Sequence, residues 1–263
     1  MRIRFGLGAW TNKHFEHTLY PLRTLHAEYL SRYAEVFDCA EADKLYHVPA
    51  DPDELSAWRD QTPDGFTFLP KLHKSVVEAR ETPEGITVAQ EWRDALEPLG
   101  PRLGPVLCQF PPSWRCTPDA LQWLDDLLEA IDHVSVELRH PSWWTDDVRD
   151  LLTRHRAPLV WGTHPKAVAP DWATGEWGHV RFVGAHFKDA RGRHTTQEDR
   201  TMDLLQMRER VQQADWQQCF VIVTNTFEGH AIDSLPRIAA ALGDPALARR
   251  CSRPPGGVLF PNR

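Results

Sequence analysis

The chain has 263 residues, close to the roughly 250 residues that a single (β/α)8 barrel needs. Its composition, 41% hydrophobic and 25% charged, is that of a globular protein and excludes disordered, fibrous and membrane-spanning chains. The formal net charge of -7 gives no reason to expect extended binding to nucleic acid, although it does not exclude a local basic pocket.

The chain start and the cysteines bear on where the protein works. The segment Met1-Arg-Ile-Arg-Phe5 lacks the apolar run of a signal peptide, and no later run is long enough for a membrane span. The five cysteines are scattered and form no Cys-x-x-Cys pair, which favours reduced thiols over disulfides or a zinc site. We therefore expect a cytoplasmic protein with no membrane partner.

Strand-like and helix-like segments alternate along the whole chain. In chain order, the expected strands are Ile3–Ala9, Phe37–Asp43, Phe66–Lys71, Pro105–Phe110, Val134–Arg139, Pro158–Gly162, His179–Gly184 and Phe220–Asn225. The expected helices are Leu25–Glu35, Asp53–Asp60, Val88–Glu97, Pro118–Ile131, Asp146–Arg154, Gln197–Ala214 and Ile232–Leu242. The pattern predicts parallel βαβ units within one domain over residues 1–263.

Eight such units favour a closed (β/α)8 TIM barrel over an open, doubly wound sheet. The open sheet usually has a glycine-rich phosphate-binding turn after its first strand, and Gly6-Leu-Gly8-Ala-Trp10 lacks the third glycine. Two long βα loops are expected, at Ala9–Thr24 and Lys71–Thr87, and the alternating charges of the second indicate a solvated flap over the mouth. The segment from Arg253 onward should form a C-terminal tail.

Alternation along the fifth strand sorts its side chains into two faces. Val134, Val136 and Leu138 form one apolar face, which must pack on helices. Glu137 and Arg139 therefore point inward near the carboxyl end of the strand. Charged groups are rarely buried without a partner or ligand, so they form either a functional site or a mutual ion pair that stabilises the mouth.

The same sorting brings polar residues from other strands to that end. They are Glu41, Asp43, Lys71, Gln109, Arg181 and Asn225. Lys71, Arg139 and Arg181 would form a cationic pocket that binds a phosphate or carboxylate, with Gln109 and Asn225 as further substrate contacts. Glu137 and Glu41 are the expected acid, base or metal ligands.

Histidines also follow several expected strands, and His140 is a further catalytic candidate. The others are His73, His164, His186 and His230. Imidazoles and carboxylates together would suit a divalent metal ion, but no metal-binding spacing occurs, and His140 before Pro141 could equally cap a turn. The metal therefore stays an open alternative.

Aromatic side chains in the loops complete the expected site. Trp10, Tyr20 and Trp143 could contact a sugar or a base, or else form an apolar lid. No Gly-x-Ser-x-Gly elbow or Walker loop is present, which disfavours acyl transfer by a serine nucleophile and P-loop nucleotide hydrolysis.

The sequence resembles the YecE-like family, domain of unknown function 72, over nearly its whole length. The most specific matches are Glu137-Leu-Arg139-His140-Pro141-Ser142-Trp143 and the segment Leu103–Ser113. Supporting matches are Gly6, Trp10, Phe15, Tyr20-Pro21, Phe37, Glu41, Phe66-Thr-Phe68, Lys71, Arg181, Gly184, Asn225 and Glu228-Gly229-His230-Ala231. The resemblance implies a (β/α)8 barrel similar in shape to sugar-isomerase and abasic-site endonuclease barrels.

Departures from the family pattern lie at the expected mouth. Leu7-Gly8-Ala9 replaces Thr-Ser-Gly, Asp43 stands where Asn is usual, Val183 replaces a histidine and Thr224 replaces an asparagine. These changes indicate a divergent branch.

We therefore expect a hydrolase or lyase that acts on a phosphate-bearing or sugar-like anionic substrate at the barrel mouth, with or without a metal. The alternative is a non-catalytic binder of a small anion or of single-stranded or damaged nucleic acid. A scaffold that has lost its chemistry is the third reading.

Overall fold

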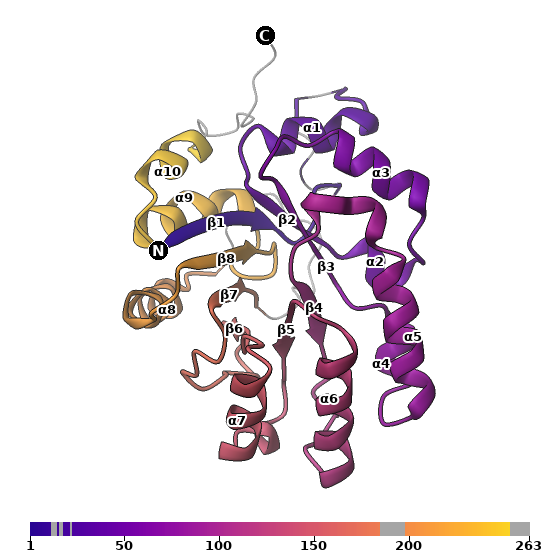
Figure 1. Ribbon diagram of the computed structural model, residues 1–263. Coiled ribbons are helices and arrows are strands. Elements are labelled where there is room, and N and C mark those ends of the chain that lie inside the picture. The colour runs from indigo at the N-terminus through magenta and orange to yellow at the C-terminus, as the bar shows by residue number, and fades with distance from the viewer. Residues whose placement is uncertain (12–14, 16–17, 22, 185–197, 253–263) are drawn as a thin grey trace.

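Eight strands alternate with helices in the structure, a computed structural model that describes residues 1–11, 15, 18–21, 23–184 and 198–252. Every pairing between strands is parallel. The strands lie at the centre of the molecule and helices surround them (Figure 1). The predicted α/β class is confirmed.

The eight strands overlap the eight that the sequence predicted. They are β1 Arg2–Leu7, β2 Cys39–Ala42, β3 Thr67–Pro70, β4 Val106–Gln109, β5 Val134–Glu137, β6 Trp161–Gly162, β7 Trp177–Phe182 and β8 Gln218–Val223. The helices are α1 Tyr29–Ala34, α2 Lys44–His47, α3 Pro52–Asp60, α4 Lys74–Glu78, α5 Pro83–Asp94, α6 Pro118–Ala130, α7 Asp146–Arg154, α8 Thr201–Gln213, α9 Ala231–Ala241 and α10 Pro245–Cys251. The helix expected from Gln197 begins at Thr201, and Gln197 itself lies outside the described residues.

Local sequence signals explain where several helices begin. Helix α6 starts after Thr117, whose hydroxyl accepts a hydrogen bond from the amide of Ala120 at 3.1 Å, with Pro118 in the first turn. Thr82 and Thr145 cap α5 and α7 in the same way. Thr117 and Thr145 each cap the first helix of four residues or more in α conformation after a strand, β4 and β5, whereas Thr82 caps the second helix after β3.

The closed barrel predicted from the sequence is not confirmed. The strands form three ladders, β1-β8-β7-β6, β2-β3 and β4-β5, rather than one closed ladder. Isolated bridges join Lys71 to Leu107 and Val136 to Leu159 across two of the gaps. The strands at these gaps are short, four residues in β3, β4 and β5 and two in β6, so little backbone is available for a continuous ladder.

Strands β1 and β2 approach each other closely although no ladder joins them. The amide of Asp38, just before β2, donates to the carbonyl oxygen of Phe5 at 3.1 Å. A Cβ atom at Gly6 would lie 2.2 Å from the carbonyl oxygen of Cys39. Glycine at position 6 therefore lets the two strands pack side by side.

The expected flap at Lys71–Thr87 is wrong, because most of this segment is helical. It contains α4 and the start of α5, and Val76 and Val77 are buried. Its alternating charges lie on helices anchored by these valines rather than on an open loop. The other expected loop, Ala9–Thr24, is described only in part, and the tail from Arg253 lies outside the described residues.

The apolar core has two parts, as strand alternation requires. The larger cluster packs the outward faces of the strands against the helices and includes Val134, Val136 and Leu138. The smaller cluster contains Cys39, Leu69, Phe220 and Ile222. These four positions alternate with the helix-facing ones, so they lie on the inward face that carries Glu41, Lys71 and Arg181.

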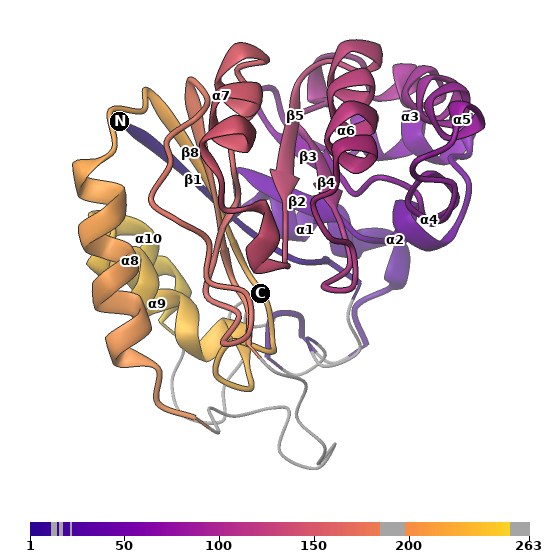
Figure 2. The same cartoon turned by 90° about the horizontal axis from the view of Figure 1, so that it is seen from below.

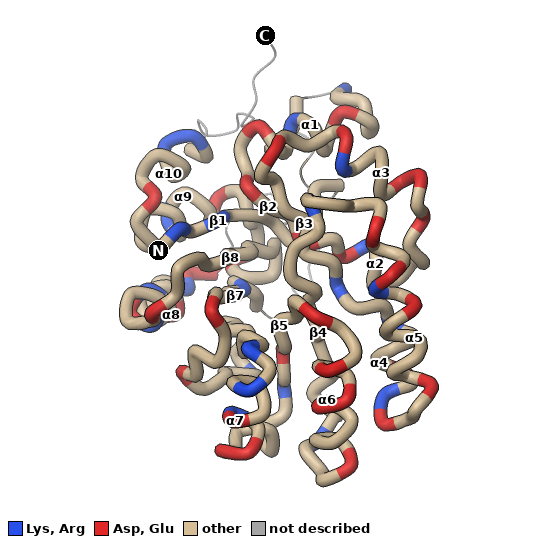
Figure 3. The backbone as a smooth tube through the Cα atoms, viewed as in Figure 1, with Lys and Arg blue, Asp and Glu red and all other residues tan. Residues whose placement is uncertain are grey.

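The outer layer is polar and mixed in charge. Figure 3 shows Lys and Arg interspersed with Asp and Glu along the surrounding helices. Helices α8, α9 and α10 pack together on one flank, beside β8 and β1 (Figure 2). Within the described residues, no helix combines the length and apolar character needed to cross a bilayer.

Candidate functional site

A buried ion-pair cluster lies at the carboxyl ends of β2, β5 and β7. Both Arg181 side-chain nitrogens that face β2 donate to Glu41, Nε to Oε2 at 2.8 Å and Nη2 to Oε1 at 2.7 Å. The third nitrogen, Nη1, donates to Glu137 Oε2 at 2.5 Å. All three side chains are at most 6% exposed. Arg181 thus holds the carboxylates of two different strands, β2 and β5.

Gln109 and Arg139 extend this cluster toward solvent. Arg139 Nε donates to Glu137 Oε1 at 2.6 Å, so each oxygen of Glu137 has its own arginine. Gln109 Oε1 accepts from Arg139 at 3.0 Å and from Arg181 at 3.1 Å. The Arg139 side chain is 21% exposed, whereas the Arg181 side chain is 5% exposed, so Arg139 has the more accessible guanidinium group.

A further cationic side chain, Lys71, lies directly after β3. Lys71 Nζ lies 3.1 Å from Asp43 Oδ1 and 4.4 Å from the centre of the Tyr46 ring. The Lys71 side chain is 11% exposed, whereas Asp43 is 40% exposed. The ammonium therefore has one partly exposed carboxylate partner and one aromatic partner.

The two carboxylates on Arg181 have opposite pKa shifts. Burial raises the pKa of Glu41, and the single guanidinium of Arg181 does not compensate for it. Burial would also raise the pKa of Glu137, but the charges and hydrogen bonds of Arg181 and Arg139 outweigh it and lower that pKa to about 2. Glu137 is therefore firmly ionised, whereas Glu41 takes up a proton more readily.

These groups form the floor of a cavity of about 610 Å³, here called the mouth pocket. Its charged lining consists of Glu41, Asp43, Lys71, Arg139 and Arg181, with His47 and His164. Gln109, Asn225 and Thr224 are among its neutral polar lining residues. Glu41 faces this cavity, whereas Glu137 is covered by the two arginines and does not line it.

A buried histidine lies one layer below the ion pairs. His179 on β7 is completely buried, and its Nδ1 is 2.7 Å from the Ser135 hydroxyl on β5. Burial, reinforced by the charge of Arg181, lowers the pKa of His179 to about 3. The imidazole is therefore neutral at physiological pH and cannot serve as a second cation beneath Arg181.

Six of the residues predicted for the site line the mouth pocket. They are Glu41, Lys71, Gln109, Arg139, Arg181 and Asn225. Asn225 also has a structural role, because its Oδ1 accepts a hydrogen bond from the amide of Ala231 at the start of α9.

Two predicted aromatic contacts need correction. Tyr20 is completely buried, stacks on Tyr29 with ring centres 4.2 Å apart and donates its hydroxyl to the Trp10 carbonyl. Trp143 is also completely buried, and its ring nitrogen donates to the carbonyl of Trp114. Neither ring offers a face to a substrate in this structure, because both are packed against other side chains. Their burial agrees with the alternative expectation of an apolar lid.

His140 is likewise placed outside the mouth pocket. Its Nδ1 accepts from the amide of Ser142 at 3.1 Å and begins the short 3-10 helix Pro141–Trp143. The turn-capping alternative therefore describes its contacts. His73 caps α4 in the same manner, His230 is buried beside Asp233, and His186 lies outside the described residues.

His164 is the one histidine of those expected at the strand ends that lines the mouth pocket within the described residues. It follows β6, and burial together with the charge of Arg139 lowers its pKa. Tyr46 is a lining residue that the sequence did not single out. It lies in the four-residue helix α2, which has no detectable apolar period, so no sequence pattern indicated that its ring would contact Lys71.

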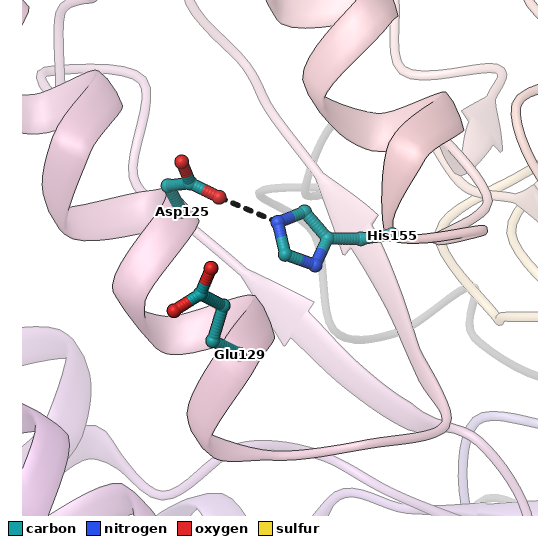
Figure 4. Close-up of side chains that lie close together, drawn as sticks. All are labelled: Asp125, Glu129 and His155. Carbon is teal, nitrogen blue, oxygen red and sulfur yellow. Dashed lines mark hydrogen bonds and ion pairs between the residues drawn. The ribbon is translucent and has the colours of Figure 1, made fainter.

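The carboxylates of the mouth pocket do not fit a metal site. Arg181 occupies both oxygens of Glu41, and Lys71 contacts Asp43. In the described part of the chain, one group of three ligand side chains comes together, namely Asp125, Glu129 and His155. Figure 4 shows Asp125 and Glu129 on one helix, α6, with His155 next to Asp125. None of the three lines the mouth pocket.

That outer group is explained by pairing between helices. His155 Nε2 is 2.5 Å from Asp125 Oδ1, and Arg154 donates to Asp125 Oδ2 at 2.8 Å. Both oxygens of Asp125 are thus occupied by side chains of the next helix, and Glu129 is exposed. An ion-pair contact between α6 and α7 accounts for the arrangement without a metal ion.

A curated protein from Escherichia coli is similar to part of this chain. The UPF0759 protein YecE of Escherichia coli K12 is 28% identical over 117 residues, which are 44% of this chain and 43% of that protein. The chain therefore matches less than half of this curated relative's length.

Solved structures match over nearly the whole chain. A DUF72 family protein from Enterococcus faecalis V583 has a TM-score of 0.71 at 20% identity, covering 91% of this chain and 95% of that one. A DUF72 family protein from Thermotoga maritima MSB8 gives 0.70 at 20% identity, covering 95% and 100%. SacUVDE is more distant, with 0.55 at 12% identity over 95% and 98% of the two chains. At these identities the likeness concerns the fold.

The sequence pattern of the family described as "Protein of unknown function DUF72" matches residues 4–256, which include the whole ion-pair cluster. The chain belongs to the DUF72 family, the YecE-like family that its sequence resembles.

Proposed function

We propose that the mouth pocket binds a small anionic substrate, phosphate-bearing or sugar-like, and that the protein is a hydrolase or lyase. Lys71 and Arg139 would hold the anion, because their charged ends are the partly exposed cations of the pocket. Arg181 would contribute to the positive potential from below while its own hydrogen bonds stay with Glu41 and Glu137.

Glu41 is the acid or base in this proposal, and Glu137 holds the two arginines in place. The observation that carries this division is the pairing with arginine: Glu41 lines the cavity and has one guanidinium group on its two oxygens, whereas each oxygen of Glu137 has its own guanidinium partner. Burial raises the pKa of Glu41, which favours a role in proton transfer. A firmly ionised, fully paired carboxylate is suited to positioning.

We also propose that the three strand ladders are arcs of one (β/α)8 barrel. The parallel order of the ladders, the two isolated bridges and the approach of β1 to β2 support this arrangement. Substrates of such barrels bind at the carboxyl ends of the strands, where the mouth pocket lies.

Binding of inorganic phosphate, measured by calorimetry, tests the first step. We expect Arg139→Ala to weaken phosphate binding about tenfold, the loss of one charge-assisted contact of about 1.4 kcal/mol. Arg149→Ala on α7 is the matched control, since Arg149 is exposed and its ion-pair partners in the described part of the chain are the neighbouring Asp146 and Asp150. Equal phosphate binding by the wild type and Arg139→Ala would contradict the proposal.

A second measurement separates catalysis from binding alone. The wild type and Glu41→Gln are compared for release of phosphate or of an elimination product from a panel of phosphate esters. Turnover that Glu41→Gln loses while it still binds phosphate supports the enzyme. Binding without turnover of any ester would favour the non-catalytic binder of small anions.

The nucleic-acid alternative relied on aromatic rings at the rim together with a cationic pocket. The cationic side chains line the mouth pocket, but two of the aromatic residues, Tyr20 and Trp143, are completely buried. A salt-sensitive shift of a labelled single-stranded oligonucleotide, lost in Arg139→Ala, would revive it. Metal analysis of the purified protein likewise tests the expectation of a divalent ion, for which the described donors do not fit.

A further inference from the structure

A second hollow of about 410 Å³, here called the side hollow, adjoins the mouth pocket. The two cavities share Ala9, Glu41 and Asp43 in their walls. The rest of the side hollow is built by different elements, including Trp10 after β1 and Ala57, Trp58 and Gln61 at the end of α3. Glu41 therefore lies at the boundary between two compartments.

We propose that the side hollow binds the uncharged, hydroxyl-bearing part of the substrate, so that the substrate is a phosphorylated sugar. This inference rests on the proposed function, since it assumes that the phosphate lies in the mouth pocket against Lys71 and Arg139. It goes beyond that function by assigning a second subsite and a substrate class.

The charges of the two compartments orient such a molecule. The mouth pocket has three cationic side chains, Lys71, Arg139 and Arg181, against the carboxylates of Glu41 and Asp43. The side hollow has the same two carboxylates and Glu54, with Lys44 as its one cation among the described lining residues. A phosphate is attracted to the first compartment and repelled from the second.

The carboxylates of the side hollow favour a neutral hydroxyl group over a further cation. Lys44 Nζ contacts both oxygens of Glu54, at 2.5 and 2.6 Å. Arg181 similarly occupies Glu41, and Lys71 contacts Asp43. Because each carboxylate already has a cationic partner, its remaining lone pairs suit donors that carry no charge, such as sugar hydroxyl groups.

Part of the wall of the side hollow is aromatic. The rings of Trp10 and Trp58 meet edge to face with centres 4.8 Å apart, and both packed rings line the cavity. Their apolar surface complements the C–H groups of a sugar ring, while Gln61 adds an amide donor and acceptor at the rim. Aromatic carbon and carboxylate oxygen in the wall of one cavity match the two kinds of surface that a sugar presents.

Calorimetric affinities for inorganic phosphate, for a panel of pentose and hexose phosphates, and for free glucose test this assignment. We expect at least one sugar phosphate to bind the wild type about tenfold more tightly than inorganic phosphate, and free glucose to bind weakly. Ala57→Phe places a ring in the side hollow from an exposed position on α3. It should remove most of the tenfold advantage and leave the affinity for inorganic phosphate within about twofold.

Ala240→Phe is the matched control, because Ala240 is exposed on α9 and lines neither compartment. It should retain the preference for the sugar phosphate. If inorganic phosphate itself does not bind, the proposed function fails. If phosphate binds but no sugar phosphate binds more tightly, or if Ala57→Phe leaves the preference intact, the inference fails while the proposed function stands. A nucleoside monophosphate that binds more tightly than every sugar phosphate would overturn the substrate class.

Discussion

The two sides of the mouth pocket use the same chemical groups in different ways. On the β4–β5 side, Glu137 has two guanidinium partners, lies beneath them and is held ionised. On the β2–β3 side, Glu41 shares only Arg181, faces both cavities and has a raised pKa. One arginine thus pairs with two carboxylates whose pKa values shift in opposite directions, and this difference is the basis of the acid or base role proposed for Glu41.

The exposure of the neighbouring charges follows the same division. Lys71 and Asp43 on the β2–β3 side form a single ion pair whose carboxylate is 40% exposed. Arg139 and Glu137 form part of a network that also includes Gln109 and Arg181. We therefore infer that the β4–β5 side is the rigid half of the pocket and the β2–β3 side the adaptable half.

Removal of Arg181 should have the largest effect on stability. Arg181→Leu leaves Glu41 without a charged partner at hydrogen-bond distance and deprives Glu137 of one of two. We expect a loss of about 4 kcal/mol in the free energy of unfolding, because buried charges remain uncompensated. Urea denaturation near neutral pH measures it, with Arg149→Leu on the surface of α7 as the control.

Arg181→Lys extends this test if the leucine variant does not fold. Lysine keeps the charge but cannot make the two parallel bonds to Glu41, so an intermediate loss is expected. A loss below about 1 kcal/mol in Arg181→Leu would mean that the ion pairs are not what holds the two sides together.

Substitution of the two carboxylates should separate the two sides directly. The depressed pKa of Glu137 means that its ionised form stabilises the folded state above the unfolded pKa of about 4.5, and that this contribution disappears as the pH falls toward about 2. Glu137→Gln should therefore cost about 3 kcal/mol near neutral pH. The raised pKa of Glu41 has the opposite sign, since ionisation of Glu41 opposes folding once the pH rises above its unfolded value.

Glu41→Gln should accordingly change stability by less than about 1 kcal/mol near neutral pH. Unfolding of both variants at several pH values measures the contrast, and each serves as the control for the other. Equal losses in the two variants would show that Glu41 and Glu137 contribute alike, and the division between a rigid and an adaptable side would be wrong.

Alternation along the strands explains why much of the site was predictable. Parity alone placed Glu137 and Arg139 on the inward face, and the same rule placed Arg181 and Glu41 there. An ion pair between Glu137 and Arg139 was predicted as the alternative to a functional site. Which carboxylate has two arginine partners could not be predicted, because this depends on the hydrogen bond from Arg139 back to Glu137.

The errors have physical causes that the sequence could not reveal. Tyr20 and Trp143 follow strands just as substrate-binding aromatics would, but their burial depends on rings from distant segments, such as Tyr29 and Trp114. The flap was expected from its charges, although two consecutive valines, Val76 and Val77, suffice to anchor α4. The closed ladder depends on strand lengths that differ by only a few residues, which sequence periods do not resolve.

The buried histidine below the pocket provides the smallest and most specific test. His179 belongs to the rigid side, since it bonds to Ser135 on β5 and lies near the charges of Arg181 and Glu137. Its pKa of about 3 is far below the unfolded value of about 6.5. Between these values the unfolded chain binds a proton that the folded protein rejects, so folding stability from this group is lost as the pH falls below about 6.5.

His179→Gln removes this proton uptake, whatever it does to stability at neutral pH. From about pH 7 to about pH 5, the wild type should lose about 2 kcal/mol more than His179→Gln. The exposed His26→Gln serves as the control and should follow the wild type. Parallel pH profiles for the wild type and His179→Gln would show that the imidazole is protonated in the folded protein. A positively charged imidazole would then lie directly beneath Arg181, in the rigid half of the pocket.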